Sequence, residues 1–150
     1  MNEYRSIFVD TWGWVVLGQR QDSYHEQVKG IYQELITNKV SIYTSDYVLD
    51  EVMTLLFKRE VFEDVVMFMT GIFTAIDRRQ VKIQRVTSGI FLEAWELRKR
   101  LEDKPLISFT DLTSMVIMKQ QNIQHVLTQD KHFIQVGMGF IRVPEDLIAG

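Results

Sequence analysis

Hydrophobic and polar residues follow two alternating patterns along this chain. Short apolar runs predict buried β-strands, and longer stretches with an apolar residue at every third or fourth position predict amphipathic helices. Five strands are expected, at residues 6–9, 41–44, 81–86, 125–128 and 140–143. The first four strands are separated by helices, which are expected at residues 12–17, 23–38, 46–58, 61–76, 87–101 and 108–121. A short turn at residues 131–134 precedes the last strand.

Strands separated by one or two helices are typical of βα units on a mostly parallel sheet. Connections of this length favour right-handed crossovers. No internal repeat, low-complexity segment or linker interrupts the pattern. The sequence therefore predicts one α/β sandwich domain over residues 1–150.

Residues with short polar side chains stand where several of these helices should begin. Ser23 is followed three residues later by Glu26, which is the spacing of a capping box. The other helix starts each offer two candidate N-caps, which are Ser45 or Asp46, Thr87 or Ser88, and Ser108 or Thr110.

Composition and charge narrow the class of protein. The net charge of −3 excludes a strongly basic nucleic-acid coat, although local basic patches remain compatible with it. The absence of cysteine excludes disulfide scaffolds and thiolate zinc sites. The longest uncharged run, residues 65–76, is too short to span a bilayer, and no secretory signal pattern opens the chain. We expect a soluble cytoplasmic protein with no membrane contact.

Two acids follow strands directly in the predicted pattern. Asp10 ends the first strand and Asp130 follows the fourth. In open α/β sheets, ligands bind in the crevice outside the carboxyl ends of the strands, so both acids are candidate site residues.

Two further acids lie beside apolar helix stripes. Asp111 is in line with Met115 and Met118 at helical spacing, where a lone charge would be costly unless it were paired or bound to a metal. Glu51 flanks the stripe of its helix, but periodicity does not separate it from Asp50 on the other flank.

Clustered carboxylates need a cation to offset their repulsion, which is about 4 kcal/mol per pair at 4 Å and an effective dielectric of 20. Mg²⁺ and Mn²⁺ prefer carboxylate and water oxygens. Zinc is less favoured because the three histidines, His25, His125 and His132, show no ligand spacing.

Each acid also has a purely structural interpretation. Asp10 can cap the helix that follows it, Asp111 can be a first-turn acid favoured by the helix dipole, and Asp130 can cap the turn at Lys131. Glu51 can simply be solvated, and a loop histidine such as His132 is more often a surface or packing residue than a general acid.

Four segments follow one another in a recognisable order and spacing: Phe8–Thr11, Val48–Val52, Ser108–Asp111 and Leu127–Phe133. The most specific part is the S-F-T-D helix start followed about 20 residues later by L-T-x-D-x-x-F. Together the segments resemble the PIN domain, and more narrowly the VapC-type toxins of bacterial and archaeal toxin–antitoxin pairs. The resemblance covers essentially the whole chain.

The resemblance implies a three-layer α/β/α sandwich and a Mg²⁺- or Mn²⁺-dependent endoribonuclease. Asp10, Glu51, Asp111 and Asp130 match the family's acidic metal-binding quartet, and Thr128 matches a hydroxyl that often precedes the last acid. An RNA substrate, a small antitoxin and a homodimer are the partners that the family implies.

One departure from the family is the pair Trp12 and Trp14, where small or aliphatic residues are commoner. Rings at these positions can narrow the cleft or pack against a partner. Together with the uncharged run at residues 65–76, they suggest an interface.

An RNA-cleaving protein also needs local positive charge. The candidate segments are Lys58-Arg59, Arg78-Arg79 with Lys82 and Arg85, and Arg98-Lys99-Arg100, although each run alone is more typical of a solvated helix end or face.

Two other functions compete with the nuclease hypothesis. The first is a non-catalytic PIN-like scaffold that binds RNA or protein. The second is a phosphatase or receiver-type protein that uses Asp10 as nucleophile or phosphate acceptor. The second is disfavoured because phosphatases of the haloacid-dehalogenase type need another Asp at the position of Trp12, and receiver domains need an acidic pair near the first strand.

Overall fold

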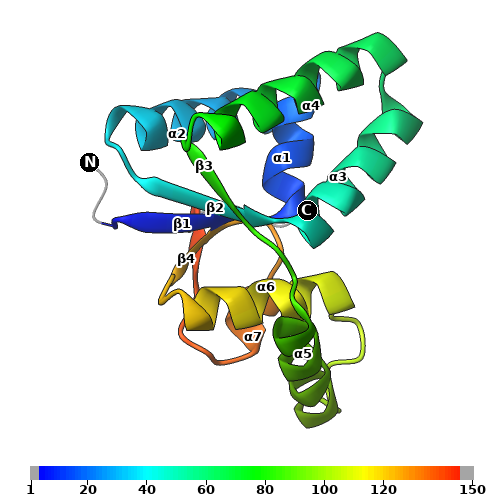
Figure 1. The fold of residues 1–150 in the computed structure, drawn as a ribbon, viewed down its shortest axis with the longest axis vertical. Helices are drawn as coiled ribbons and strands as arrows, with labels where there is room; N and C mark the ends of the chain where they lie inside the picture. Colours follow the sequence, from blue (N-terminus) through cyan, green and yellow to red (C-terminus); the bar gives the residue numbers. More distant parts are fainter. Residues whose placement is uncertain (1–3, 146–150) are drawn as a thin grey trace.

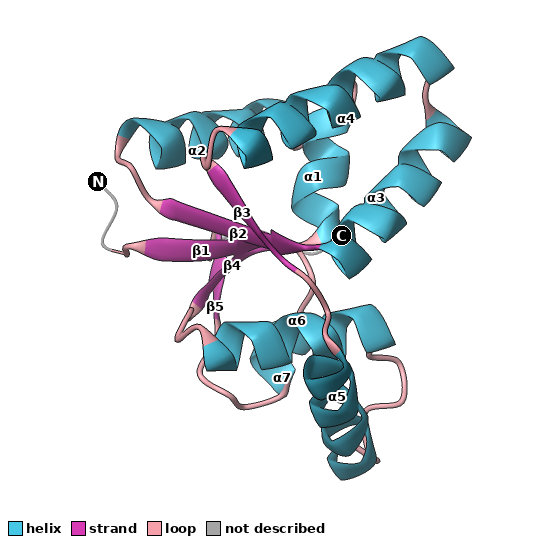
Figure 2. Cartoon of the chain, in the orientation of Figure 1, coloured by secondary structure: helices cyan, strands magenta, loops and turns pink. Residues whose placement is uncertain are grey.

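Five parallel strands form the centre of the molecule, and helices cover both of their faces (Figures 1 and 2). The computed structural model describes residues 4–145. The strand order is β3-β2-β1-β4-β5, and every neighbouring pair is parallel. The strands are β1 (Ser6–Val9), β2 (Ser41–Ser45), β3 (Val81–Gln84), β4 (His125–Leu127) and β5 (Ile141–Val143).

The helices divide into two layers around this sheet, so the predicted three-layer α/β/α sandwich is confirmed. One layer contains α1 (Thr11–Gly18), α2 (His25–Thr37), α3 (Asp46–Arg59) and α4 (Phe62–Asp77). The other contains α5 (Ser88–Arg100), α6 (Phe109–Gln120) and α7 (His132–Gln135). No helix in the part of the chain that the structure describes is long and apolar enough to cross a membrane.

The two layers follow from a reversal in the order of the strands. From β1 to β3 the chain adds each strand on the same side, and after β3 it returns to place β4 on the other side of β1. Right-handed crossovers put the helices on opposite faces when this direction reverses. The reversal makes the gap between β1 and β4 a topological switch point, where α/β proteins bind ligands.

The ends of β1 and β4 are held together at the switch point. Val9 pairs with Leu127, and the backbone N–H of Asp10 donates to the Leu127 carbonyl at 3.2 Å. The residues that leave these two strands therefore start from adjacent positions.

The sequence offered candidate N-caps for four helices, and in three of these helices a predicted residue is the cap. The side chains of Ser45, Thr87 and Ser108 accept backbone hydrogen bonds from the first turns of α3, α5 and α6. The predicted cap at Ser23 is wrong, because α2 begins at His25. The Asp22 carboxylate accepts from the Tyr24 backbone N–H at 2.8 Å, and this turn fixes the helix start in place of Ser23.

Two predicted strand ends also differ from the structure. The third strand was expected to continue to Val86, but β3 ends at Gln84, and the Val86 N–H donates to the Asp46 carboxylate instead. The fourth strand was expected to include Thr128, but β4 ends at Leu127, so Asp130 lies three residues beyond it.

Helix α1 packs closely on the ends of β1 and β4. Trp14 is 2% exposed, and its indole N–H donates to the Thr44 hydroxyl, which in turn donates to the Val9 carbonyl. Trp14 is therefore a core residue, and its predicted role at an interface is wrong. A Cβ on Gly13 would lie 2.9 Å from a Val9 methyl and 3.2 Å from the Leu127 carbonyl oxygen.

We expect Gly13→Ala to destabilise the protein by about 1–3 kcal/mol, because the added methyl must push α1 away from the sheet. Urea denaturation measures this change. Gly30→Ala on α2 is the matched control, since a Cβ there meets nothing within 4 Å. The free energy of unfolding of that control should rise by about 0.5–1 kcal/mol, as expected for Gly→Ala inside a helix. Equal stability of the two variants would contradict the close packing of α1.

Candidate functional site

A cleft of about 800 Å³ opens at the carboxyl ends of β1 and β4. All four acids of the predicted quartet line it: Asp10, Glu51, Asp111 and Asp130. They come from the start of α1, the first half of α3, the start of α6 and the loop after β4. Residues more than 100 positions apart in the sequence thus meet at the switch point of the sheet.

Asp10 is 3% exposed, and its side chain is fixed by Thr128. The Thr128 hydroxyl donates to Asp10 Oδ2 at 2.8 Å, and its oxygen accepts from the Asp130 backbone N–H at 3.0 Å. Asp10 occupies the N-cap position of α1, but its side chain caps no helix N–H. The capping alternative is therefore wrong, and Asp10 Oδ1 is buried with no hydrogen-bond partner among residues 4–145.

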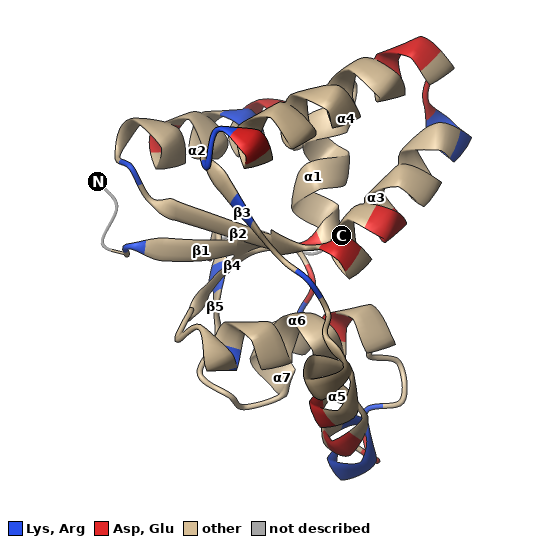
Figure 3. Cartoon of the chain, viewed as in Figure 1, with Lys and Arg blue, Asp and Glu red and all other residues tan. Residues whose placement is uncertain are grey.

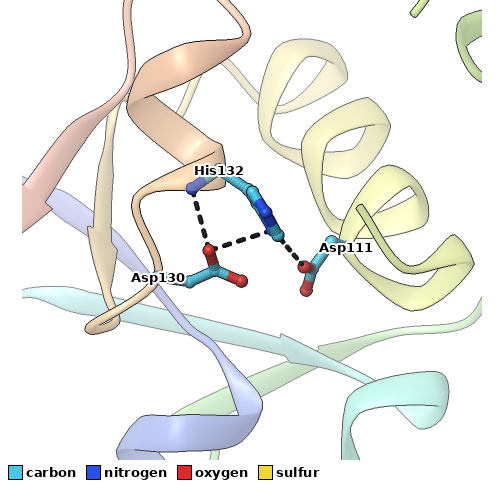
Figure 4. A group of neighbouring side chains, drawn as sticks. All are labelled: Asp111, Asp130 and His132. Carbon is cyan, nitrogen blue, oxygen red and sulfur yellow. Dashed lines mark hydrogen bonds and ion pairs between the residues drawn. The ribbon is translucent and has the colours of Figure 1, made fainter. Parts of the chain in front are cut away.

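Asp130 and His132 form a compact group with Asp111 (Figure 4). Asp130 Oδ1 accepts from the His132 backbone N–H at 2.8 Å, so Asp130 does stabilise the turn into α7 while it also lines the cleft. His132 Nδ1 lies 3.1 Å from Asp130 Oδ1 and 3.9 Å from Asp111 Oδ2. Its orientation leaves Nδ1 buried without a hydrogen bond.

Glu51 is held at the cleft by the residue that follows Asp10. The Thr11 hydroxyl donates to Glu51 Oε1 at 2.8 Å. Asp50, which the sequence did not separate from Glu51, is exposed and does not line the cleft. The helical turn therefore directs only one of these two neighbouring acids to the site.

Asp111 is placed by the N-terminus of α6. Its backbone N–H donates to the Ser108 hydroxyl at 3.0 Å, so Asp111 lies in the first turn as the dipole interpretation required. That interpretation alone does not explain its burial, because Asp111 is only 8% exposed and faces the other acids. First-turn acids that serve only the dipole are usually solvated.

The acids raise one another's pKa values. Burial, followed by the charges of Asp10 and Asp130, raises the pKa of Asp111 to about 9. Burial also raises the pKa of Asp10 to about 6, against the hydrogen bond from Thr128, which lowers it. Both shifts reflect the cost of placing like charges in a site that water reaches poorly.

This arrangement fits a divalent cation. Asp111, Asp130 and His132 each place one donor atom within 4.8 Å of the other two. The unpartnered Asp10 Oδ1 and the nearby Glu51 add further oxygen donors. An oxygen-rich set of this kind is typical of Mg²⁺ and Mn²⁺ sites.

Positive charge around the cleft comes from one predicted residue and one that was not predicted. Arg59, from the predicted pair Lys58-Arg59, lines the cleft, and so does Lys131, which the sequence did not single out as a basic candidate. Arg98 is committed elsewhere, because its guanidinium donates to three backbone carbonyls around the loop that follows α5. Arg79 lies with Lys82 near the opposite ends of the strands.

Two residues of the site were missed or undervalued at the level of sequence. Thr11 gave no signal, because its contact with Glu51 depends on the packing of α1 against α3. His132 was interpreted as a surface or packing residue, although its position two residues after Asp130 could have indicated a shared turn. Its place beside Asp111 depends on the approach of α6 and α7 and was not visible in the local spacing.

Comparison with known proteins gives matches over nearly the whole chain. The 23S rRNA-specific endonuclease VapC20 of Mycobacterium tuberculosis is 29% identical over 136 residues, which cover 91% of this chain and 98% of the relative. The crystal structure of VapC20, named a Sarcin-Ricin loop cleaving toxin, matches with a TM-score of 0.71 and 32% identity, over 87% of this chain and 95% of that one.

A second solved structure shares the fold at lower identity. VapBC2 from Rickettsia felis, crystallised with a DNA fragment from its promoter, matches with a TM-score of 0.68 and 21% identity, over 91% of this chain and 96% of that one. The sequence profile described as "PIN domain" matches residues 7–138. With that match, the parallel sheet and the acids gathered at its switch point, the chain belongs to the PIN domain family.

Proposed function

We propose that this protein is a metal-dependent endoribonuclease that hydrolyses RNA phosphodiester bonds and serves as the toxin of a type II toxin–antitoxin pair. It acts as a single nuclease domain in the cytoplasm. The observation that carries the proposal is the convergence of Asp10, Glu51, Asp111 and Asp130 in one cleft. VapC20, which matches this chain over nearly its whole length, is named as a ribosomal-RNA endonuclease and supports RNA as the substrate class.

The cofactor proposed for this cleft is Mg²⁺ or Mn²⁺, held by the four carboxylates. A bound cation of this kind supplies a Lewis acid and an activated water for phosphodiester hydrolysis. Burial, with the charges of the neighbouring acids added to it, raises the pKa values of Asp10 and Asp111, and a bound cation would offset both costs.

The protein's own residues position the acids. Thr128 fixes one oxygen of Asp10 and also binds the backbone of Asp130, so it aligns two acids at once. The Thr11 hydroxyl fixes one oxygen of Glu51. His132 Nδ1 lies 3.1 Å from Asp130 Oδ1, so the imidazole ring closes one side of the acidic group.

The proposed protein partners, a second copy and a small antitoxin, need an apolar surface. The middle of α4 carries no charge (Figure 3), and Val66, Met67 and Phe73 are exposed there, with Met67 72% exposed. A helix with buried residues on one side and exposed large apolar residues on another is typical of a protein interface.

Removal of a quartet acid should abolish cleavage. We expect Asp10→Asn and Glu51→Gln to lose essentially all RNA cleavage in Mg²⁺ or Mn²⁺, and EDTA to stop the wild-type protein. Thr128→Val should lower the rate of RNA cleavage by about 10- to 100-fold, as is common for residues that orient a metal ligand. Asp50→Asn is the matched control beside Glu51 and should cleave normally. Full activity of Asp10→Asn would refute the proposal, and RNA binding without any cleavage would favour the scaffold alternative.

The metal-free protein should become less stable as pH rises. The unfolded chain releases the Asp111 proton near the ordinary pKa of 3.8, whereas the folded protein keeps it to about pH 9. The unfolded state therefore binds fewer protons in this range, and stability falls between these values. Asp111→Asn should flatten this dependence, because Asn needs no proton to lie uncharged among the acids. It should raise the metal-free melting temperature at pH 8 by about 2–4 °C for each kcal/mol of protonation cost removed.

Thermal melts in EDTA across this pH range test that expectation, with Asp50→Asn as the control because its side chain is exposed. Added Mg²⁺ should raise the melting temperature of the wild type more than that of Asp111→Asn. A lower metal-free melting temperature for Asp111→Asn at pH 8 would contradict the raised pKa of Asp111.

A charge in the middle of α4 should weaken protein association. We expect Met67→Asp to convert the purified dimer to a monomer, or to prevent co-purification of a small partner, while RNA cleavage by the isolated protein persists. Light scattering measures whether a second copy is bound, and pull-down measures whether the small partner is bound. Asn122→Asp adds the same charge at an exposed position at the end of α6. This control should change neither the mass of the dimer nor the co-purification of the small partner. An unchanged mass and an unchanged partner in Met67→Asp would exclude this surface.

A further inference from the structure

Trp12 lines the catalytic cleft, and none of the roles described above uses its ring. It lies two residues after Asp10, in the first turn of α1. Its ring packs edge-on against Tyr24, with ring centroids 5.9 Å apart and planes at 61°. The side chain is only partly buried, in contrast to Trp14 on the same helix, which is 2% exposed. Trp12 is therefore held in position and still presents aromatic surface at the cleft.

Arg59 and Lys131 line the same cleft but do not neutralise its acids. Among residues 4–145, neither side chain forms an ion pair or a hydrogen bond. Arg59 comes from the last turn of α3 and Lys131 from the loop before α7, so positive charge reaches the cleft from two separate elements. Cations that stay unpaired beside four acids remain available for an anionic ligand.

Apolar side chains complete this part of the cleft. Leu55 on α3 and Leu106 on the loop before α6 both line it, and Leu106 is 84% exposed. The cleft thus combines an acidic group, a partly exposed indole, apolar side chains and two unpaired cations. A nucleotide has matching parts, because its base offers a flat apolar face and its backbone offers phosphates.

We infer that Trp12 is a stacking platform for a base next to the scissile phosphate, and that Arg59 and Lys131 bind flanking phosphates. The inference rests on the proposed ribonuclease function and specifies its substrate class. The preferred RNA presents an unstacked nucleotide, in a single strand or a loop, because bases inside a continuous duplex are already stacked on one another. Trp12 thereby becomes a residue that selects substrate, separate from the acids that hold the cation.

An abasic series tests the stacking role with the wild-type protein itself. The probe is a short single-stranded RNA that the wild-type protein cleaves, prepared as a set in which each member lacks one base. Removal of the base that stacks on Trp12 should lower kcat/KM by about 5- to 150-fold, the range expected for one base stacked on an aromatic ring. The same RNA annealed to its complement should be cleaved much more slowly.

Protein variants assign that effect to Trp12. Trp12→Leu should lower kcat/KM on the intact RNA to a similar extent, mainly through KM, and should no longer respond to loss of the sensitive base. Trp12→Phe keeps a stacking ring and should retain most of the activity and of the abasic response. Trp95→Leu is the matched control, because Trp95 is exposed on α5 and does not line the cleft.

Salt dependence tests the two cations. Arg59→Gln and Lys131→Gln should each reduce the slope of log KM against log salt concentration by about 0.7, the value for one lost phosphate contact on a single strand. Lys58→Gln is the matched control, since Lys58 is the exposed neighbour of Arg59 and does not line the cleft. Its slope should equal that of the wild type.

The possible failures are distinguishable. A wild-type protein that cleaves RNA but responds to no abasic position, or a Trp12→Leu variant that keeps the full abasic response, overturns the stacking inference and leaves the nuclease function intact. Normal cleavage by Trp12→Leu together with loss of a co-purifying protein would assign Trp12 to a protein contact instead. A wild-type protein that cleaves no RNA in Mg²⁺ or Mn²⁺ overturns the proposed function and the inference together. If Trp12→Leu fails to fold, Trp12→Met takes its place, because Met is also apolar and has no ring, and the same loss of the abasic response is expected.

Discussion

Repulsion among four carboxylates in one cleft is the constraint on which the site depends. The protein meets it with rigid supports at the switch point of the sheet: the Asp10 N–H bonds to Leu127, Thr128 joins Asp10 to Asp130, and Thr11 holds Glu51. Each support comes from an element packed on the ends of β1 or β4. Burial, followed by the charges of neighbouring acids, raises the pKa values of Asp10 and Asp111, so these supports hold the acids where their charged forms are costly.

The position of α1 matters for holding these carboxylates together. This helix follows Asp10 directly, so its position sets the direction of the Asp10 side chain. Gly13 allows the close approach to Val9 and Leu127, and Trp14 anchors the helix through Thr44 to the end of β1. Thr11 and Trp12, on the first turn, then line the cleft as a consequence of that packing. A substitution that shifts α1 would therefore disturb a proposed metal ligand, a positioning hydroxyl and the indole at once.

Sequence reasoning reached the fold and the acids because both leave local signals. Alternating apolar runs predict strands and helices wherever one face is buried, and the order of these elements restricts the topology. The acids were visible because Asp10 follows an apolar strand and Asp111 interrupts an apolar stripe. The residues that were missed or misjudged have no such local cause. Thr11, His132 and the burial of Trp14 depend on helices that meet only in the folded chain.

The helix start at residues 23–25 shows how two local signals compete. Ser23 and Glu26 have the spacing of a capping box, yet the Asp22 carboxylate binds the Tyr24 N–H and α2 begins at His25. An Asp side chain binds the backbone two residues on at little conformational cost, and this turn makes Tyr24, not Ser23, the residue that precedes the helix. This start places Tyr24 against the edge of the Trp12 ring. A local turn at Asp22 therefore supports the ring that packs against Trp12 beside the cleft.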